Sequence, residues 1–134
     1  MILIFTLDNQ NGVNLAGKRQ SKDRAVADRI LSLAAGRLHI KSYTAKFFKN
    51  TSIEPCYTII ESYSKVPSDA ICFAEEVLPM EMLDAADKIY VFRWNRDYPS
   101  LAQDRLNLDG FNVEVIDEFP GNSHEKITLE VYTK

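Results

Sequence analysis

The sequence predicts a single α/β domain spanning residues 1–134, with a mixed β-sheet of about five to six strands, helices packed on it and a C-terminal antiparallel hairpin. Three observations predict this class. Residues 22–35 carry apolar side chains at helical spacing. The C-terminal part alternates apolar with polar residues around a turn. Continuous apolar runs, typical of buried strands, occur at 2–7, 70–74 and 89–92.

The N-terminal part is predicted to run from a strand through a loop into a helix. The strand at 2–7 ends in a polar, turn-forming segment, and the loop that follows reaches about Ser21. Ser21 is a good helix N-cap, and Gly36 is a good C-terminal stop. The sequence therefore predicts an amphipathic helix over 22–35.

The next segment carries weaker patterns. Residues 38–41 alternate apolar with polar side chains and predict a short strand, after which Ser42 is expected to cap a helical turn. Residues 49–70 are interrupted by prolines and turn-forming residues, and within them only 57–60 resembles a strand. We therefore interpret 49–70 as an insertion within the domain.

The C-terminal half predicts two supersecondary units. An apolar strand at 70–74, a short helix beginning at Pro79 and a second strand beginning at Lys88 form a parallel strand, helix, strand unit. Residues 112–119 and 127–132 alternate in polarity and flank a polar turn, so they are expected to pair as an antiparallel hairpin at the sheet edge.

A dense set of hydrogen-bonding side chains follows the strand that begins at Lys88. They are Arg93, Trp94, Asn95, Arg96, Asp97 and Tyr98, and Pro99 closes the run. In open α/β sheets ligands gather at the carboxyl ends of strands, so this run is a candidate site. The alternative is a polar strand end, with Trp94 packed in the core and the arginines solvated or paired.

Composition limits the function classes. A hydrophobic fraction of 46%, a charged fraction of 26% and a net charge of −3 are those of a globular protein without the basic surface typical of nucleic-acid binding. The first ten residues lack the basic region of a signal peptide, and their apolar run is too short to span a membrane. Cys56 and Cys72 are expected to be reduced, buried thiols, which favours a cytoplasmic protein.

Metal and cofactor chemistry have no motif support. His39 and His124 lie far apart and outside any metal-ligand spacing, and no glycine-rich nucleotide or phosphate loop is present. We therefore expect no metal and no cofactor. Ser123, His124 and Glu125 are adjacent, but neighbouring strand residues point to opposite faces, so they are not expected to form a catalytic triad.

A metal-independent enzyme that handles phosphate or cleaves RNA remains one interpretation. In such a site histidine and glutamate move protons while arginine holds the phosphate. The start of the helix over 22–35 also favours an anionic partner, through its free N–H groups. The alternative is that Asp23 satisfies the helix dipole while Arg19 and Arg24 are surface residues. The residues available for this chemistry are Arg19, Arg24, Asn95, Arg96, His124 and Glu125.

Three runs carry a family resemblance, and they cover most of the chain apart from 49–70. They are Arg19-Gln20-Ser21-Lys22-Asp23-Arg24, Trp94-Asn95-Arg96-Asp97-Tyr98-Pro99 and Ser123-His124-Glu125-Lys126-Ile127-Thr128. With the opening strand, they resemble small bacterial proteins often labelled ribonuclease Z, which are similar to the immunity proteins of contact-dependent growth inhibition systems. A zinc ribonuclease Z requires many more histidines than the two of this chain, so we reject that activity.

The resemblance implies a non-enzymatic immunity protein that binds and neutralises a toxic nuclease domain, without contacting nucleic acid or membrane itself. Nucleases present basic clefts for their substrates, and carboxylates that imitate phosphate can cover such a cleft or an adjacent surface. The acidic residues expected to bind the toxin are Glu75, Glu76, Asp97, Asp117 and Glu118. Of these, the hairpin pair Asp117 and Glu118 is preferred, because an edge strand also offers unpaired backbone groups.

Overall fold

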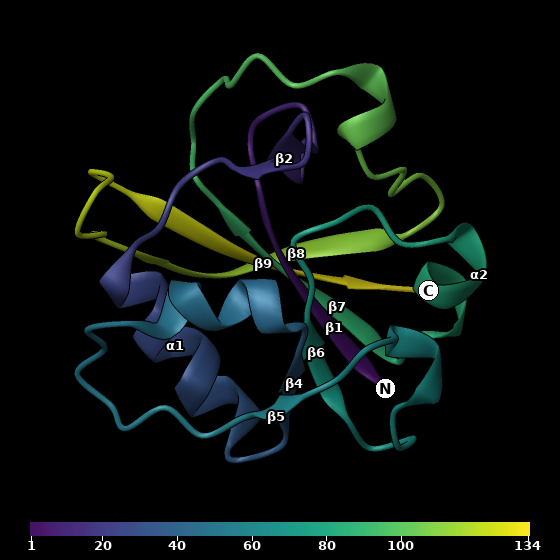
Figure 1. Cartoon of the computed structure of the whole chain (residues 1–134). Coiled ribbons are helices and arrows are strands. Elements are labelled where there is room, and N and C mark those ends of the chain that lie inside the picture. The colour runs from purple at the N-terminus through teal and green to yellow at the C-terminus, as the bar shows by residue number, and fades with distance from the viewer.

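The computed structural model describes all 134 residues as an α/β domain built on a seven-stranded mixed sheet (Figure 1). The elements in chain order are β1 (Ile2–Leu7), β2 (Asn14–Leu15), β3 (Lys18–Arg19), α1 (Arg24–Ala34), β4 (Leu38–Ile40), the 3-10 helix η1 (Ser42–Phe48), β5 (Thr58–Ile59), the 3-10 helix η2 (Tyr63–Lys65), β6 (Ile71–Phe73), α2 (Met80–Ala85), β7 (Lys88–Arg93), the 3-10 helix η3 (Ala102–Asp104), β8 (Asn112–Phe119) and β9 (Ile127–Thr133).

The sheet has the strand order β5-β4-β6-β1-β7-β9-β8. The first five of these strands are mutually parallel, whereas β9 runs antiparallel to both β7 and β8. The predicted class, the parallel strand, helix, strand unit and the C-terminal hairpin are thus confirmed, with β1 lying between β6 and β7. The seventh strand is β5, a two-residue edge strand inside the segment interpreted as an insertion.

Each face of the sheet is covered, which explains the continuous apolar runs. On one face α1 and η1 pack against Ile4, Phe73 and Phe92. The opposite face buries Phe5 and Val91 with residues from η2, α2 and the loop before β8. Alternate residues of β1 and β7 therefore enter different cores. None of the helices is long and apolar enough to cross a membrane.

Four local predictions need correction. Ser42 does not cap the turn that follows it, because it is the first residue of η1, whose N-cap position is Lys41 and carries no side-chain cap hydrogen bond. The N-cap of α1 is Asp23 instead of Ser21, since the Asp23 carboxylate accepts hydrogen bonds from the N–H groups of Ala25 and Val26. The expected loop before α1 contains a small hairpin made of β2 and β3. Cys72 is buried as predicted, but Cys56 is exposed.

Candidate functional site

Polar residues of the three sequence runs come together near the carboxyl ends of the parallel strands. β6 ends before Glu75, β7 ends before Trp94, and the β2–β3 hairpin brings Arg19 to the same end of the sheet. This is the position at which ligands bind in open α/β sheets. The residues form three separate groups there: an ion-pair cluster around Glu75, a buried network around His124 and a cleft beside Trp94.

The ion-pair cluster fixes the β2–β3 hairpin to the sheet. Arg19 donates from Nε and Nη2 to the two carboxylate oxygens of Glu75, at 2.6 and 2.7 Å, in a bidentate arrangement. The guanidinium also lies 4.6 Å from the ring centroid of Tyr43. The Glu75 side chain is 5% exposed, so its charge is neutralised within the fold. Glu76 is more exposed and pairs with Lys41 at 2.6 Å.

A pocket of about 240 Å³ lies beside this cluster, between the β2–β3 hairpin, η1 and the end of β6. Its wall contains both carboxylates together with aromatic and basic side chains: Lys41, Tyr43, Tyr63, Glu75 and Glu76. The cations of Arg19 and Lys41 already occupy the carboxylates and lie over Tyr43 and Tyr63 respectively. The pocket's charges are therefore satisfied from within the chain.

The buried network joins the start of α1 to the loop before β9. Asp23 caps α1 with Oδ1, while its Oδ2 accepts hydrogen bonds from the N–H and the hydroxyl of Ser123, at 2.8 and 3.0 Å. A Cβ atom at Gly121 would lie only 2.6 Å from this Oδ2, so the loop can approach Asp23 because residue 121 is glycine. The predicted anion position at the helix start is thus filled by the chain's own Asp23.

His124 is held on both of its ring nitrogens. Nδ1 lies 2.7 Å from the Ser123 hydroxyl, Nε2 lies 2.9 Å from the Tyr98 hydroxyl, and the ring stacks on Trp94 with centroids 4.5 Å apart. The Ser123 hydroxyl is surrounded by acceptors, the Lys22 carbonyl and Asp23 Oδ2, so its proton goes to one of them. We therefore assign the His124 proton to Nδ1, which leaves Nε2 to accept from Tyr98.

Electrostatics keep this network in one protonation state. Burial lowers the pKa of His124 below its ordinary value; the nearby Asp23 carboxylate opposes the shift, and the positive charge of Arg96 adds to it. Burial alone would raise the pKa of Asp23, but hydrogen bonds from backbone N–H groups, among them those of Ser123 and Val26, outweigh burial and lower it. The network thus contains an ionised Asp23 beside a neutral histidine.

The adjacency argument about Ser123, His124 and Glu125 was right only in part. Ser123 and His124 lie in a loop instead of a strand, and they do contact each other. In a serine hydrolase the carboxylate holds the nitrogen remote from the serine. Here Asp23 and Ser123 both lie on the Nδ1 side, and Glu125 takes no part. Asp23, Ser123 and His124 therefore form a buried, hydrogen-bonded contact that holds two loops together.

The cleft beside Trp94 is the third group, and we call it the Trp94 cleft. It has a volume of about 260 Å³ and is lined by Trp94, Asn95, Arg96, Glu125 and Lys126. Asn95 adopts a left-handed backbone conformation (φ 59°) and donates from Nδ2 to the Lys126 carbonyl and to Thr128 Oγ1, both at 3.0 Å. These bonds hold the loop after β7 against β9, so the cleft is built on a fixed frame.

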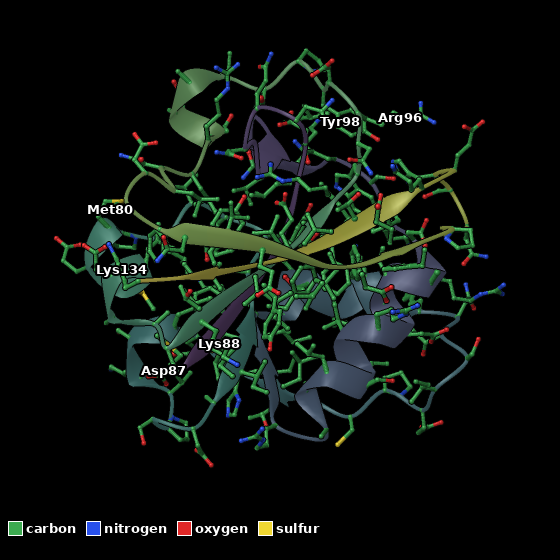
Figure 2. All side chains as sticks on the ribbon, turned by 180° about the vertical axis from the view of Figure 1, so that it is seen from behind. Met80, Asp87, Lys88, Arg96, Tyr98 and Lys134 are labelled. Atoms are coloured by element: carbon green, nitrogen blue, oxygen red, sulfur yellow. The ribbon has the colours of Figure 1, made fainter.

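The side chains of Arg96 and Glu125 take no part in the contacts that hold the fold together. Both are exposed, and neither side chain forms a hydrogen bond or an ion pair within the chain. Figure 2 shows Arg96 at the surface, near Tyr98, on the loop that follows β7. The indole of Trp94, by contrast, is 1% exposed, and its Nε1 has no hydrogen-bond partner. The predicted burial of Trp94 is therefore confirmed, and its donor is unsatisfied.

The remaining predicted residues lie outside these groups or at their margins. Gln20 donates from Nε2 to the buried Asp8 at 3.4 Å, and Ser21 is half-buried before α1. Arg24 is exposed and forms no ion pair, and Asp97 is also exposed. The structure thus brings Asn95, Arg96 and Glu125 to one cleft, places His124 behind Trp94, and keeps Arg19 with Glu75.

Sequence reasoning missed the role of Arg93. Its guanidinium donates to Glu130 Oε1 at 2.7 Å, to the Tyr132 hydroxyl at 2.8 Å and to the Asp8 carbonyl at 2.8 Å. The signal was present, because Glu130 and Tyr132 alternate on β9 and so share one face of the sheet. Arg93 therefore joins β7, β9 and the loop after β1.

The acidic hairpin pair lies on β8, the outer strand of the sheet. Asp117 pairs with Arg29 of α1, and Glu118 pairs with Lys126 at 2.8 Å; all four side chains are partly exposed. Val113 and Val115, each 55% exposed, pair with Tyr132 and Glu130 of β9 and so project from the same face. Ile116, 45% exposed, lies at a β-bulge.

No group of three or more histidine, cysteine, aspartate or glutamate side chains is arranged to hold a metal ion. In comparisons with known proteins, no family model matches the chain and no curated protein is significantly similar to it.

Proposed function

We propose that this protein is an immunity protein, which binds and neutralises a toxic nuclease domain through the free edge of β8. The observation that carries the proposal is the exposed β8 edge, an eight-residue strand that has β9 on one side and no strand on the other. The runs that resemble the immunity proteins supply the class of partner.

The β8 edge has the properties of a strand that accepts another strand. Its outer backbone N–H and C=O groups are unpaired, and Val113 and Val115 add an exposed apolar surface on one face. Soluble proteins usually protect long edge strands, because these groups pair readily with another chain. The bulge after Val115 interrupts the regular pairing, so we assign the contact to the first half of β8, residues 112–115.

A pocket also lies beside this half-strand, on the face of the sheet that carries Asn112 and Glu114, opposite the side chains of Val113 and Val115. It has a volume of about 340 Å³ and is lined by Lys88, Asn112, Val113, Glu114, Val131 and Thr133. A side chain from a paired strand can enter such a pocket, which gives specificity to an interaction whose affinity comes from main-chain hydrogen bonds.

Charge favours a basic partner. β8 carries Glu114, Asp117 and Glu118, and the whole chain has a net charge of −3. A nuclease that binds RNA presents positive charge, so opposite charges steer the encounter. Glu114 forms no ion pair within the chain, and the exposed pairs of Asp117 and Glu118 contribute little to stability, so all three can contact a partner. Glu75 fits this role less well, because Arg19 already neutralises it.

The test is protection of cells. The neighbouring genes are first searched for a large secreted protein with a short basic C-terminal domain; this domain is then co-expressed with the protein, and growth is measured together with binding of the purified pair. The double variant Val113→Lys, Val115→Lys keeps the fold, since both side chains are exposed, but places positive charge against a basic partner. We expect it to lose protection and to weaken binding at least about tenfold.

The matched control lies at the opposite edge of the sheet. Thr58 and Ile59 of β5 are both exposed, so the double variant Thr58→Lys, Ile59→Lys introduces the same two charges on the other edge strand and should leave protection intact. Loss of protection in the control alone would assign the interface to β5. Failure of the unchanged protein to protect against the neighbouring nuclease would remove the immunity function itself.

A further inference from the structure

We propose that the Trp94 cleft is a binding site for a small phosphorylated sugar, such as a nucleoside monophosphate. The proposal goes beyond the β8 interface and does not depend on it, because the cleft and β8 use different residues. It is a proposal about binding, since His124, the nearest proton-transfer group, is held on both nitrogens behind Trp94.

The donors of the cleft are those of an oxyanion site. Arg96 offers a guanidinium that no carboxylate of the chain occupies, and Lys126 adds a second positive charge at the rim, where it also pairs with Glu118. Trp94 forms part of the wall, and its buried Nε1–H lacks an acceptor. The Nε1 atom itself is not accessible from the cleft, so Trp94 contributes wall to the site, and Arg96 and Lys126 are its cationic donors.

Glu125 determines what kind of oxyanion ligand the cleft accepts. It is an exposed, unpaired carboxylate in the same wall as Arg96, and the two do not pair with each other. A bare anion would satisfy the arginine and be repelled by the glutamate. A phosphorylated sugar satisfies both, because its phosphate accepts hydrogen bonds from Arg96 and its hydroxyl groups donate to Glu125.

The size and rigidity of the cleft fit such a ligand. Its volume of about 260 Å³ lies near the lower end of the range for small-ligand sites. The loop that carries Arg96 is held at several points: the Arg96 carbonyl accepts a hydrogen bond from the Asn9 N–H at 2.9 Å, and Asn95 is bonded to Lys126 and Thr128. A pre-formed site of this kind loses little conformational entropy on binding.

The chain contains one tryptophan, so Trp94 reports on its own cleft without labelling of other sites. The experiment titrates the protein with inorganic phosphate, ribose, ribose 5-phosphate and adenosine monophosphate at constant ionic strength. It follows Trp94 fluorescence and the single indole N–H resonance by NMR. We expect saturable changes with the three phosphate compounds in both signals, and at least about tenfold tighter binding of ribose 5-phosphate than of phosphate or ribose.

Two variants make the result specific. Arg96→Gln should weaken ribose 5-phosphate binding at least about tenfold, and Glu125→Gln should remove most of the preference for ribose 5-phosphate over inorganic phosphate. Arg37→Gln is the matched control, because Arg37 is exposed before β4, at the opposite end of the parallel strands, and should bind as the unchanged protein does. Absence of a saturable change, or equal weakening by Arg37→Gln, would overturn the proposal.

Discussion

At the scale of single residues, the three sequence runs divide into residues that hold the fold and residues that do not. Trp94 is buried against His124, and Asp23 is buried under the loop before β9. Arg24 and Arg96, which belong to the same runs, are exposed and unpaired. Neighbouring positions of one sequence run therefore have different roles, and we expect only the buried ones to be needed for folding.

The first prediction separates these two kinds of residue by their effect on stability. Trp94→Ala removes a fully buried aromatic side chain and should lower the free energy of unfolding by about 3–5 kcal/mol. Arg24→Ala and Arg96→Ala remove exposed side chains without partners and should change it by less than about 0.5 kcal/mol. Urea unfolding measures all three variants. Equal destabilisation by the arginine variants would contradict the division.

The second prediction concerns the pH dependence of His124. Burial lowers its pKa in the folded protein, so the unfolded chain binds the proton more readily. The stabilising contribution is fully present above the unfolded pKa of about 6.5 and is lost as pH falls through the lower folded pKa, by about 1.4 kcal/mol per unit of pKa difference. The melting temperature should therefore fall as pH drops below about 6.5.

Two variants test this assignment in the same buffer series. His124→Gln should be less stable at neutral pH but should lose little further stability between neutral pH and the range in which carboxylates begin to protonate. His39→Gln, which alters a histidine on β4 outside the network, should keep the pH profile of the unchanged protein. If His39→Gln flattened the profile and His124→Gln did not, the pH dependence of stability would come from His39, and the assignment to His124 would be wrong.

At the scale of elements, the sequence predicted most of the strands, because continuous apolar runs or alternating polarity mark them. β8 was predicted with its correct bounds, and β1 with both of its ends, since a polar or turn-forming residue follows each. The small β2–β3 hairpin was missed, because its two-residue strands are too short to show periodicity. It depends instead on the Arg19–Glu75 ion pair, which joins residues 56 positions apart.

The start of α1 shows why a local rule can select the wrong residue. Ser21 and Asp23 are both good N-cap residues, and the choice depends on a loop one hundred residues away in the sequence. Ser123 and Asn122 come to Asp23 and to the first N–H groups of α1, and they make Asp23 the cap. The Trp94 cleft could not be predicted from local sequence either, because the two loops that line it come together only when β7 and β9 pair.

The third prediction tests this cap directly. Asp23→Ala removes both the cap and the acceptor of Ser123, so it should destabilise the protein by more than the about 0.5–2 kcal/mol of an ordinary cap. Ser21→Ala should change stability by less than about 0.5 kcal/mol. Thermal unfolding of the two variants distinguishes them. A larger loss of stability in Ser21→Ala than in Asp23→Ala would indicate that Ser21, as predicted from the sequence, is the N-cap.

At the scale of the whole molecule, the two proposals use opposite parts of one scaffold. The loop after β7 and the loop between β8 and β9 build the Trp94 cleft. The antiparallel pair β8–β9 ends the sheet with a free edge (Figure 1). β9 connects them, because it pairs with both β7 and β8. The sheet thus holds a free strand edge and a polar cleft in a fixed relation.

The most direct test of the central claim is amide hydrogen exchange of the protein alone and in complex with the nuclease domain identified by the protection experiment proposed above. If a strand of the nuclease pairs with β8, the outward β8 amides at 112–115, which have no partner within the sheet, should become protected from exchange, while β5 at the opposite edge stays unchanged. Protection confined to another surface, with the β8 amides exchanging as fast as in the free protein, would contradict the account.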